Sequence, residues 1–197
     1  MSLDHAPDGT AEDGDGRARL FVALELPGGT RDAVGRWQAR ALQGLDGVRA
    51  IARDDLHATM CFLGWRSEHE IGAIGDACEV LAAYAAPDLR VAAGMWLPPR
   101  RPRVLAVELE DPSGALARAQ AALADTLEAG GWYRRENRPY LAHVTVARLG
   151  RGSRLPRRPL PDAPEVGFRA TQVTLYRSRL LRSGARYEPL ASVELMG

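Results

Sequence analysis

Two histidine–threonine pairs are the residues of this sequence best placed to do chemistry. His57 and Thr59 lie in the apolar run DLHATMCFLG, and His143 and Thr145 lie in YLAHVTVARLG. Each pair has the pattern His-x-Thr, and each run ends in Leu-Gly. Successive side chains of a strand alternate between its two faces, so the histidine and the threonine of a pair share one face. The sequence therefore predicts two equivalent polar faces on two apolar strands, which we expect to face each other across a groove.

Two imidazoles and two hydroxyls around one point suit displacement at a phosphorus atom. Imidazole titrates near pH ~6.5, so one ring can accept a proton while the other donates one. In-line displacement places the attacking and leaving oxygens on opposite sides of the phosphorus, and a duplicated site offers one histidine to each. Threonine hydroxyls can donate hydrogen bonds to phosphoryl oxygens without adding charge. No acidic cluster accompanies the motifs, which predicts chemistry without a metal ion or other cofactor.

A structural role is the alternative for each histidine, because a single histidine in a strand usually serves packing. Two copies at equal spacing, each inside an apolar strand, favour catalysis. We expect the remaining histidines to be inert, since His5 lies in an acidic terminal segment and His69 in an exposed turn. Arginine-rich segments at 97–103 and 151–164 are either solvated loops or substrate contacts. Ser, His and Asp are available for a triad, but no nucleophile-elbow motif accompanies them.

Alternating strands and helices are predicted to position the two motifs. Helices are expected from an N-cap at Thr30 to about residue 42, after a capping box of Ser67 and Glu70, and over 113–129. Strands are expected where apolar residues alternate, at 18–26, 56–63, 89–96, 103–109, 141–149, 169–180 and 187–195.

The order of these elements indicates an internal duplication. His57 and His143 are 86 residues apart, as are Thr59 and Thr145. The pair Glu-Leu at 25–26 recurs at 108–109, an offset of 83. Duplicated units usually pack about a pseudo-two-fold axis, so equivalent elements meet. The domain prediction is a single two-lobed unit over 18–197, with halves of about 18–86 and 87–197.

Composition limits the class of protein. The chain has 197 residues, 46% of them hydrophobic, which suits one domain with a substantial core. It contains no run of 18 apolar residues and no visible signal peptide, so we expect no membrane association. Cys61 and Cys78 have no metal-binding spacing and are expected to be buried thiols in a reducing cytoplasm. Nothing suggests a coiled coil, and a monomer is expected.

Charge is distributed unevenly along the chain. All 26 basic residues are arginine, whose planar guanidinium suits phosphate and base contacts. Residues 1–17 carry a net charge of −4 and are expected to form a disordered acidic tail. A net charge of +5 is left for residues 18–197, which suits an anionic substrate.

The two motifs resemble the HxTx signatures of the two-histidine (2H) phosphoesterases, and especially the RNA 2',3'-cyclic phosphodiesterase branch, also called 2'-5' RNA ligases. The resemblance covers nearly the whole chain after the tail. RLFVALELP (19–27) is similar to the family's opening strand, and LYRSRLLRSGARYEPL (175–190) to its closing segment. Many members have proline before the second histidine, where this chain has Ala142.

The resemblance implies a bilobal α+β fold, with two antiparallel sheets flanked by helices and both histidines in a central cleft. It also implies hydrolysis of a 2',3'-cyclic phosphate on an RNA end or nucleotide, leaving a 2'-phosphate. His57 would be the proton donor and His143 the proton acceptor, while Thr59 and Thr145 would hold the phosphate. Arg148 would stack on the terminal base, although strand parity puts it on the face opposite His143. Phe62 has the same parity and is expected in the core.

Two other functions remain open from the sequence. The same histidines could run the reverse reaction and join a cyclic-phosphate end to a 5'-hydroxyl, as a 2'-5' RNA ligase. Alternatively, the chain could bind RNA or nucleotides without catalysis, although intact histidines and threonines argue against this function.

Overall fold

One nine-stranded sheet dominates the computed structural model, which describes residues 16–150, 159–181 and 184–197. The order of its strands is β7-β4-β5-β6-β3-β1-β8-β9, with β2 also paired to β6, and all pairs are antiparallel. The strands are β1 (Arg17–Glu25), β2 (Val48–Ala50), β3 (His57–Ser67), β4 (Asp88–Leu97), β5 (Val104–Glu110), β6 (His143–Leu149), β7 (Gly167–Arg169), β8 (Gln172–Leu181) and β9 (Gly184–Glu194). The α-helices are α1 (Gly28–Leu42), α2 (Ile71–Cys78) and α3 (Ala115–Ala129).

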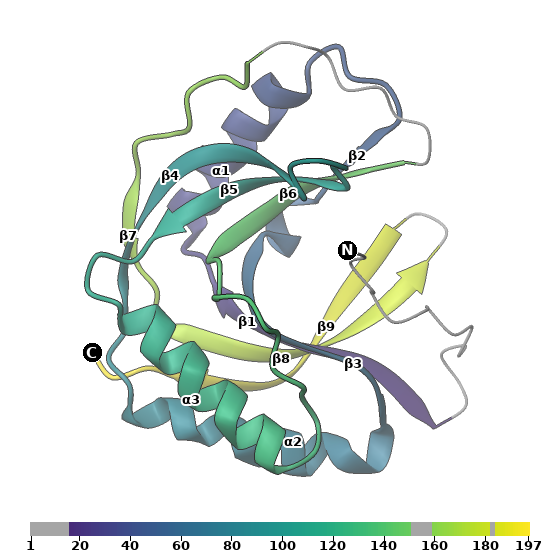
Figure 1. Cartoon of the computed structure of the whole chain (residues 1–197), viewed down its shortest axis with the longest axis vertical. Coiled ribbons are helices and arrows are strands. Elements are labelled where there is room, and N and C mark those ends of the chain that lie inside the picture. The colour runs from purple at the N-terminus through teal and green to yellow at the C-terminus, as the bar shows by residue number, and fades with distance from the viewer. Residues whose placement is uncertain (1–15, 151–158, 182–183) are drawn as a thin grey trace.

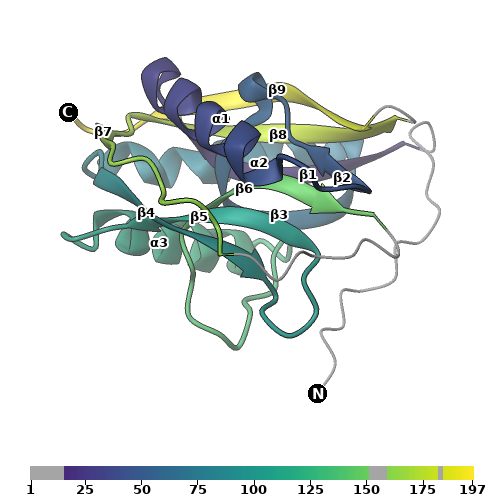
Figure 2. The same ribbon diagram turned by 90° about the horizontal axis from the view of Figure 1, so that it is seen from above.

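The two halves of the sheet meet where β3 pairs with β6. Their ladder contains a single registered pair, Ala58 with Val144, and the strands then diverge (Figure 1). Seen from above, β8 and β9 lie on the opposite side of the molecule from β4 and β5 (Figure 2). The expected α+β fold is confirmed, with the two expected sheets joined into one curled sheet.

The junction of β3 and β6 also locates the axis of the duplication. Ala58 and Val144 are 86 residues apart, the same offset that separates the two motifs. A residue that pairs with its own equivalent lies on the axis relating the halves. A pseudo-two-fold axis relating the predicted halves would therefore pass between Ala58 and Val144, one residue away from both histidines.

Apolar residues on one face of the strands form the core with the helices. α1 packs against β2 and β6, whereas α2 packs against β9 and α3 against β3. Trp37 of α1 is fully buried, and its indole N–H donates to the carbonyl of Pro161 at 3.0 Å. Leu116, Leu123 and Leu127 bury one face of α3. Each such leucine stabilises the fold by about 1.5–3 kcal/mol relative to an exposed position.

Local sequence signals were largely reliable, with one error at the start of α1. The capping box of Ser67 and Glu70 is present at the turn before α2. Thr30 is not an N-cap, because α1 begins at Gly28 after Pro27 and buries Thr30 within its first turn. Proline suits the residues flanking a helix start because its φ is already fixed near the helical value.

Some predicted segments differ from the structure or lie outside it. The short strands β2 and β7 were not expected. β1 begins at Arg17, and most of the predicted acidic tail (1–15) lies outside the described residues, as does 151–158 of the predicted second arginine-rich loop. Within the described segments, no helix is both long enough and apolar enough to cross a membrane.

Candidate active site

The two motifs lie side by side at the junction of the sheet. Continuing the register of Ala58 and Val144 by one residue in each direction places His57 beside Thr145 and Thr59 beside His143. The two strands are joined at one registered pair, and the groove between the motifs stays a prediction. Each histidine thus has the threonine of the other motif as its neighbour.

Both imidazoles are oriented by the same backbone hydrogen bond. Nδ1 of His57 is 2.7 Å from the carbonyl oxygen of Asp55, and Nδ1 of His143 is 2.8 Å from that of Leu141. A carbonyl can only accept, so Nδ1 of each ring carries a proton. The other ring nitrogen, Nε2, is left to accept or donate the proton that matters in a reaction.

Two β-bulges determine which side chains beyond each motif lie on the same face as its histidine and threonine. In β3 the register to β1 moves from Thr59 directly to Cys61, so Met60 is an extra residue. In β6 the register to β5 moves from Thr145 directly to Ala147, so Val146 is the extra residue. An extra residue reverses the alternation of side chains beyond it.

Phe62 and Arg148 consequently share the face of the histidines. Phe62 is 40% exposed rather than in the core, so that prediction was wrong. Arg148 is exposed on the side predicted for substrate, and strand parity failed because the bulge was not foreseen. The two residues are 86 apart, so the bulges belong to the duplication. Beside them, the guanidinium of Arg19 lies 4.5 Å from the ring centre of Phe62.

Three aromatic rings enclose His57. The ring of Phe21 is stacked on the imidazole at a centroid distance of 4.9 Å, and Tyr187 meets it edge-on at 5.2 Å. Tyr176 lies at 6.3 Å and also stacks on Phe21. Burial lowers the pKa of His57 to about 4, against the opposing effects of the Asp55 carbonyl and the Glu25 carboxylate. His57 is therefore neutral at pH 7 in the free protein, with an unprotonated Nε2.

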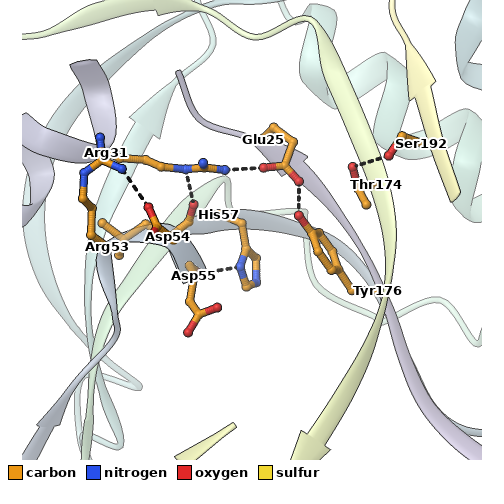
Figure 3. Close-up of polar contacts among 10 residues, drawn as sticks. Glu25, Arg31, Arg53, Asp54, Asp55, His57, Thr174, Tyr176 and Ser192 are labelled. Carbon is orange, nitrogen blue, oxygen red and sulfur yellow. Dashed lines mark hydrogen bonds and ion pairs between the residues drawn. The ribbon is translucent and has the colours of Figure 1, made fainter. Parts of the chain in front are cut away.

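A polar network near His57 joins Glu25, Arg31 and Tyr176 (Figure 3). Glu25 is the cross-strand partner of His57, and its carboxylate accepts from Arg31 and from the Tyr176 hydroxyl. Arg31 also donates to the carbonyl of Leu56 at 3.4 Å. Glu108 is the corresponding cross-strand partner of His143. The repeated Glu-Leu pair was the sequence signal for both glutamates, but its meaning depended on strand register.

The threonines have small neighbours on both sides of the junction. Thr59 pairs with Ala23 of β1, and Thr145 pairs with Ala106 of β5. The hydroxyl of Tyr140 donates to the backbone carbonyl of Thr59 at 3.1 Å, which ties the segment before β6 to β3.

The structure also places the other candidate residues. His69 is exposed in the turn before α2, whereas His5 lies outside the described residues. Cys61 and Cys78 are buried and free, and burial raises the pKa of each thiol to about 12. Among residues 16–150, 159–181 and 184–197, no group of three or more His, Cys, Asp or Glu side chains could hold a metal ion.

Comparisons with known proteins agree with this arrangement. The chain is 29% identical over 173 residues to an RNA 2',3'-cyclic phosphodiesterase of Escherichia coli K12, covering 87% of this chain and 93% of the relative. It superposes on the protein TT0787 of Thermus thermophilus with a TM-score of 0.78 at 26% identity, covering 91% and 98% of the two chains. E. coli LigT complexed with 3'-AMP gives 0.75 at 28% identity, covering 92% and 99%.

A family model places the chain among these proteins. The model of the 2'-5' RNA ligase superfamily matches residues 30–180, a span that includes both His-x-Thr motifs, both bulges and the junction between β3 and β6. This protein therefore belongs to the 2'-5' RNA ligase superfamily.

Proposed function

We propose that this protein is a phosphodiesterase that hydrolyses 2',3'-cyclic phosphates on RNA ends or nucleotides to 2'-phosphates, without a metal ion. The observation that carries the proposal is the pair of histidines about one axis, each with Nδ1 bound to a carbonyl and each beside the threonine of the other motif. This is an arrangement for two proton transfers on opposite sides of one phosphorus atom.

The proposed roles follow the path of the protons. Nε2 of His143 accepts a proton from water as the water oxygen attacks phosphorus. The bond from phosphorus to the 3'-oxygen breaks, and that oxygen takes a proton from Nε2 of His57. The products are a 3'-hydroxyl and a 2'-phosphate. Thr59 and Thr145 donate hydrogen bonds to the non-bridging oxygens, where charge accumulates.

The low pKa of His57 sets a condition on its role as proton donor. With a pKa of about 4, roughly one His57 in 10³ is protonated at pH 7 in the free protein. An anionic phosphate bound against the ring favours the charged imidazolium, as the nearby carboxylate of Glu25 does. We therefore propose that His57 takes up its proton together with the substrate.

The relatives support the choice of substrate. The E. coli relative is named an RNA 2',3'-cyclic phosphodiesterase, and LigT of the same species has been crystallised with 3'-AMP. Arg148, on the face of the histidines, is proposed to stack on the terminal base through its planar guanidinium. Absence of a metal-ligand cluster from the described residues is compatible with the proposed metal-free reaction.

Incubation of the protein with an oligonucleotide ending in a 2',3'-cyclic phosphate tests this function. We expect a 2'-phosphate product, identified by ³¹P NMR, at an undiminished rate in excess chelator. A dominant 3'-phosphate would reverse the roles of the two histidines, and rescue of chelated protein by a divalent ion would refute metal independence. Adding an oligonucleotide with a 5'-hydroxyl detects the ligase reaction, and binding without turnover would identify a non-catalytic module.

We also propose that the enzyme is a monomer of the cytoplasm. Both cysteines are free and buried, as suits a reducing compartment. Light scattering of the purified protein should give the mass of a single chain.

A further inference from the structure

Two arginines face each other across strands β2 and β6. Arg49 and Arg148 are registered cross-strand partners, so their side chains leave the sheet on the same face. Both are exposed. Because the bulge at Val146 turns Arg148 to the face of His143 and Thr145, Arg49 also lies on that face.

This pair has no carboxylate partner among the described residues, unlike eight other arginines of the described chain. Within the described part of the chain, no hydrogen bond or ion pair joins the side chain of Arg49 or Arg148 to another residue. Like charges directly opposite one another on neighbouring strands destabilise a sheet. The arginines that do have a carboxylate partner are Arg31, Arg53, Arg90, Arg135, Arg138, Arg169, Arg177 and Arg179.

The pair continues a row that starts at the catalytic residues. On this face of β6, His143, Thr145 and Arg148 follow one another; the registered pair Ala58–Val144 lies between the two histidine–threonine motifs, and Arg148 is registered with Arg49. Arg148 is close enough for its charge to oppose protonation of His57. The step from Thr145 to Arg148 is two ladder positions, about 7 Å at the usual rise per residue.

The two ends of this row carry opposite charges. Glu108 is the cross-strand partner of His143, at the end of the row away from the arginines. A polyanion that enters the site avoids this carboxylate and extends toward Arg49 and Arg148. Guanidinium groups bind phosphate through paired N–H donors, and the flat face of Arg148 remains available to a base.

We propose that Arg49 and Arg148 form a second phosphate subsite, which holds the internucleotide phosphate adjacent to the terminal cyclic phosphate. The proposal rests on the proposed function and specifies its substrate as an RNA end rather than a free cyclic nucleotide. Arg49 is the distinctive residue of the subsite, because Arg148 is also assigned to the terminal base.

Three substrates with the same terminal base distinguish the contribution of the internucleotide phosphate to kcat/KM from that of the terminal cyclic phosphate. They are a nucleoside 2',3'-cyclic phosphate, a dinucleotide with the same cyclic end, and that dinucleotide with a neutral methylphosphonate linkage. The wild-type protein should have the highest kcat/KM on the charged dinucleotide. Neutralising the linkage should remove about ten- to a hundredfold, the range of charge-assisted hydrogen bonds. This comparison needs no variant and so does not depend on how a variant folds.

Arg49→Gln then tests the residue. Its loss of kcat/KM on the charged dinucleotide should exceed its loss on the mononucleotide at least tenfold, and its salt dependence on the dinucleotide should weaken. Arg49→Lys, which keeps the charge, should lie between wild type and Arg49→Gln. Arg40→Gln, at an exposed position on α1, is the matched control for net charge and should keep the wild-type preference.

Equal losses on both substrates in Arg49→Gln would overturn the proposal, because Arg49 would then act on the scissile phosphate or on folding. Equal rates of the wild-type protein on the charged and neutral linkages would also overturn it. If no cyclic phosphate is hydrolysed at all, the proposed function fails, which is a result distinct from both.

Discussion

His57 and His143 have the same backbone hydrogen bond but different surroundings. Phe21 and Tyr187 contact the imidazole of His57, whereas no aromatic ring of the described residues is stacked on His143. The motif thus fixes which chemical groups are present and how they are oriented. The residues around each motif then give the two histidines different surroundings. A symmetric pair of histidines can in this way supply an acid and a base, which a single displacement at phosphorus requires.

Loss of either histidine should remove one of the two proton transfers. We expect His57→Ala and His143→Ala each to reduce turnover of a cyclic phosphate by roughly 10²–10⁴-fold. The double variant should lose far less than the product of the two, because residues that act as a unit are not additive. Steady-state kinetics and circular dichroism of the three proteins check this. A folded single variant with near-wild-type turnover would rule out the paired mechanism.

Replacement of Tyr187 should change the protonation of His57. Tyr187→Ala opens the edge of the imidazole to water, so its pKa should rise from about 4 toward ~6.5. NMR titration of the His57 ring measures this directly. Since kcat/KM requires one protonated and one neutral histidine, its profile should be bell-shaped, and its acidic limb should move to higher pH in parallel.

Tyr187→Phe is the matched control, because it keeps the ring and removes only the hydroxyl. We expect its His57 pKa and acidic limb to stay near those of the wild type. An unchanged His57 pKa in Tyr187→Ala would mean that the aromatic enclosure is not the cause of the shift.

Residue types were easier to predict from the sequence than residue neighbours. His57, Thr59, His143 and Thr145 could be identified because strand alternation is a local property and the motif occurs twice. The rings around His57 come from β1, β8 and β9, up to 130 residues away in the chain. Their contact with His57 depends on which strands pair, and no local pattern specifies that pairing.

At the scale of elements, the two β-bulges had the largest effect on the site. Strand alternation places Phe62 and Arg148 on the core side, and one extra residue in each strand reverses this. Met60 and Val146 are ordinary strand residues, so nothing in the local sequence marks them as extra. The strands and helices themselves were predictable from periodicity, apart from short β2 and β7, which depend on pairing with long neighbours.

Tyr140 should stabilise the junction between β3 and β6. The ladder there has one registered pair, and the Tyr140 hydroxyl adds a hydrogen bond to the carbonyl of Thr59. Tyr140→Phe leaves that carbonyl without this donor, which should lower the free energy of unfolding by about 1–3 kcal/mol. Urea denaturation measures the change. Turnover should also fall, because the carbonyl belongs to the residue proposed to hold the phosphate.

Tyr133→Phe controls for the loss of a tyrosine hydroxyl. Tyr133 lies just after α3, and no hydrogen bond of its hydroxyl to another described residue is present. It should unfold at nearly the wild-type urea concentration. If both variants lose the same stability, the hydrogen bond to Thr59 does not hold the junction together.

At the scale of the whole molecule, the two halves of the sequence do not build separate parts of the sheet. β1 and β3 come from the first half of the chain, but they share their part of the sheet with β8 and β9. β6 comes from the second half but pairs with β2 and β3 of the first half. Duplication was predictable because it preserves the order of motifs, whereas this mixed pairing joins strands far apart in sequence.

The mixed pairing should make the protein unfold as one unit. Separating either half of the sequence would break ladders in both parts of the sheet, so neither part can open while the other stays native. In hydrogen exchange under EX2 conditions, the slowest amides of β1 and β8 should have the same opening free energy as those of β5 and β6, equal to that of global unfolding. Added urea should reduce both values with the same slope, because the same surface becomes exposed in each opening. If one set of strands instead opened at lower free energy with a smaller slope, the single pair Ala58–Val144 would be a boundary between two independently stable lobes.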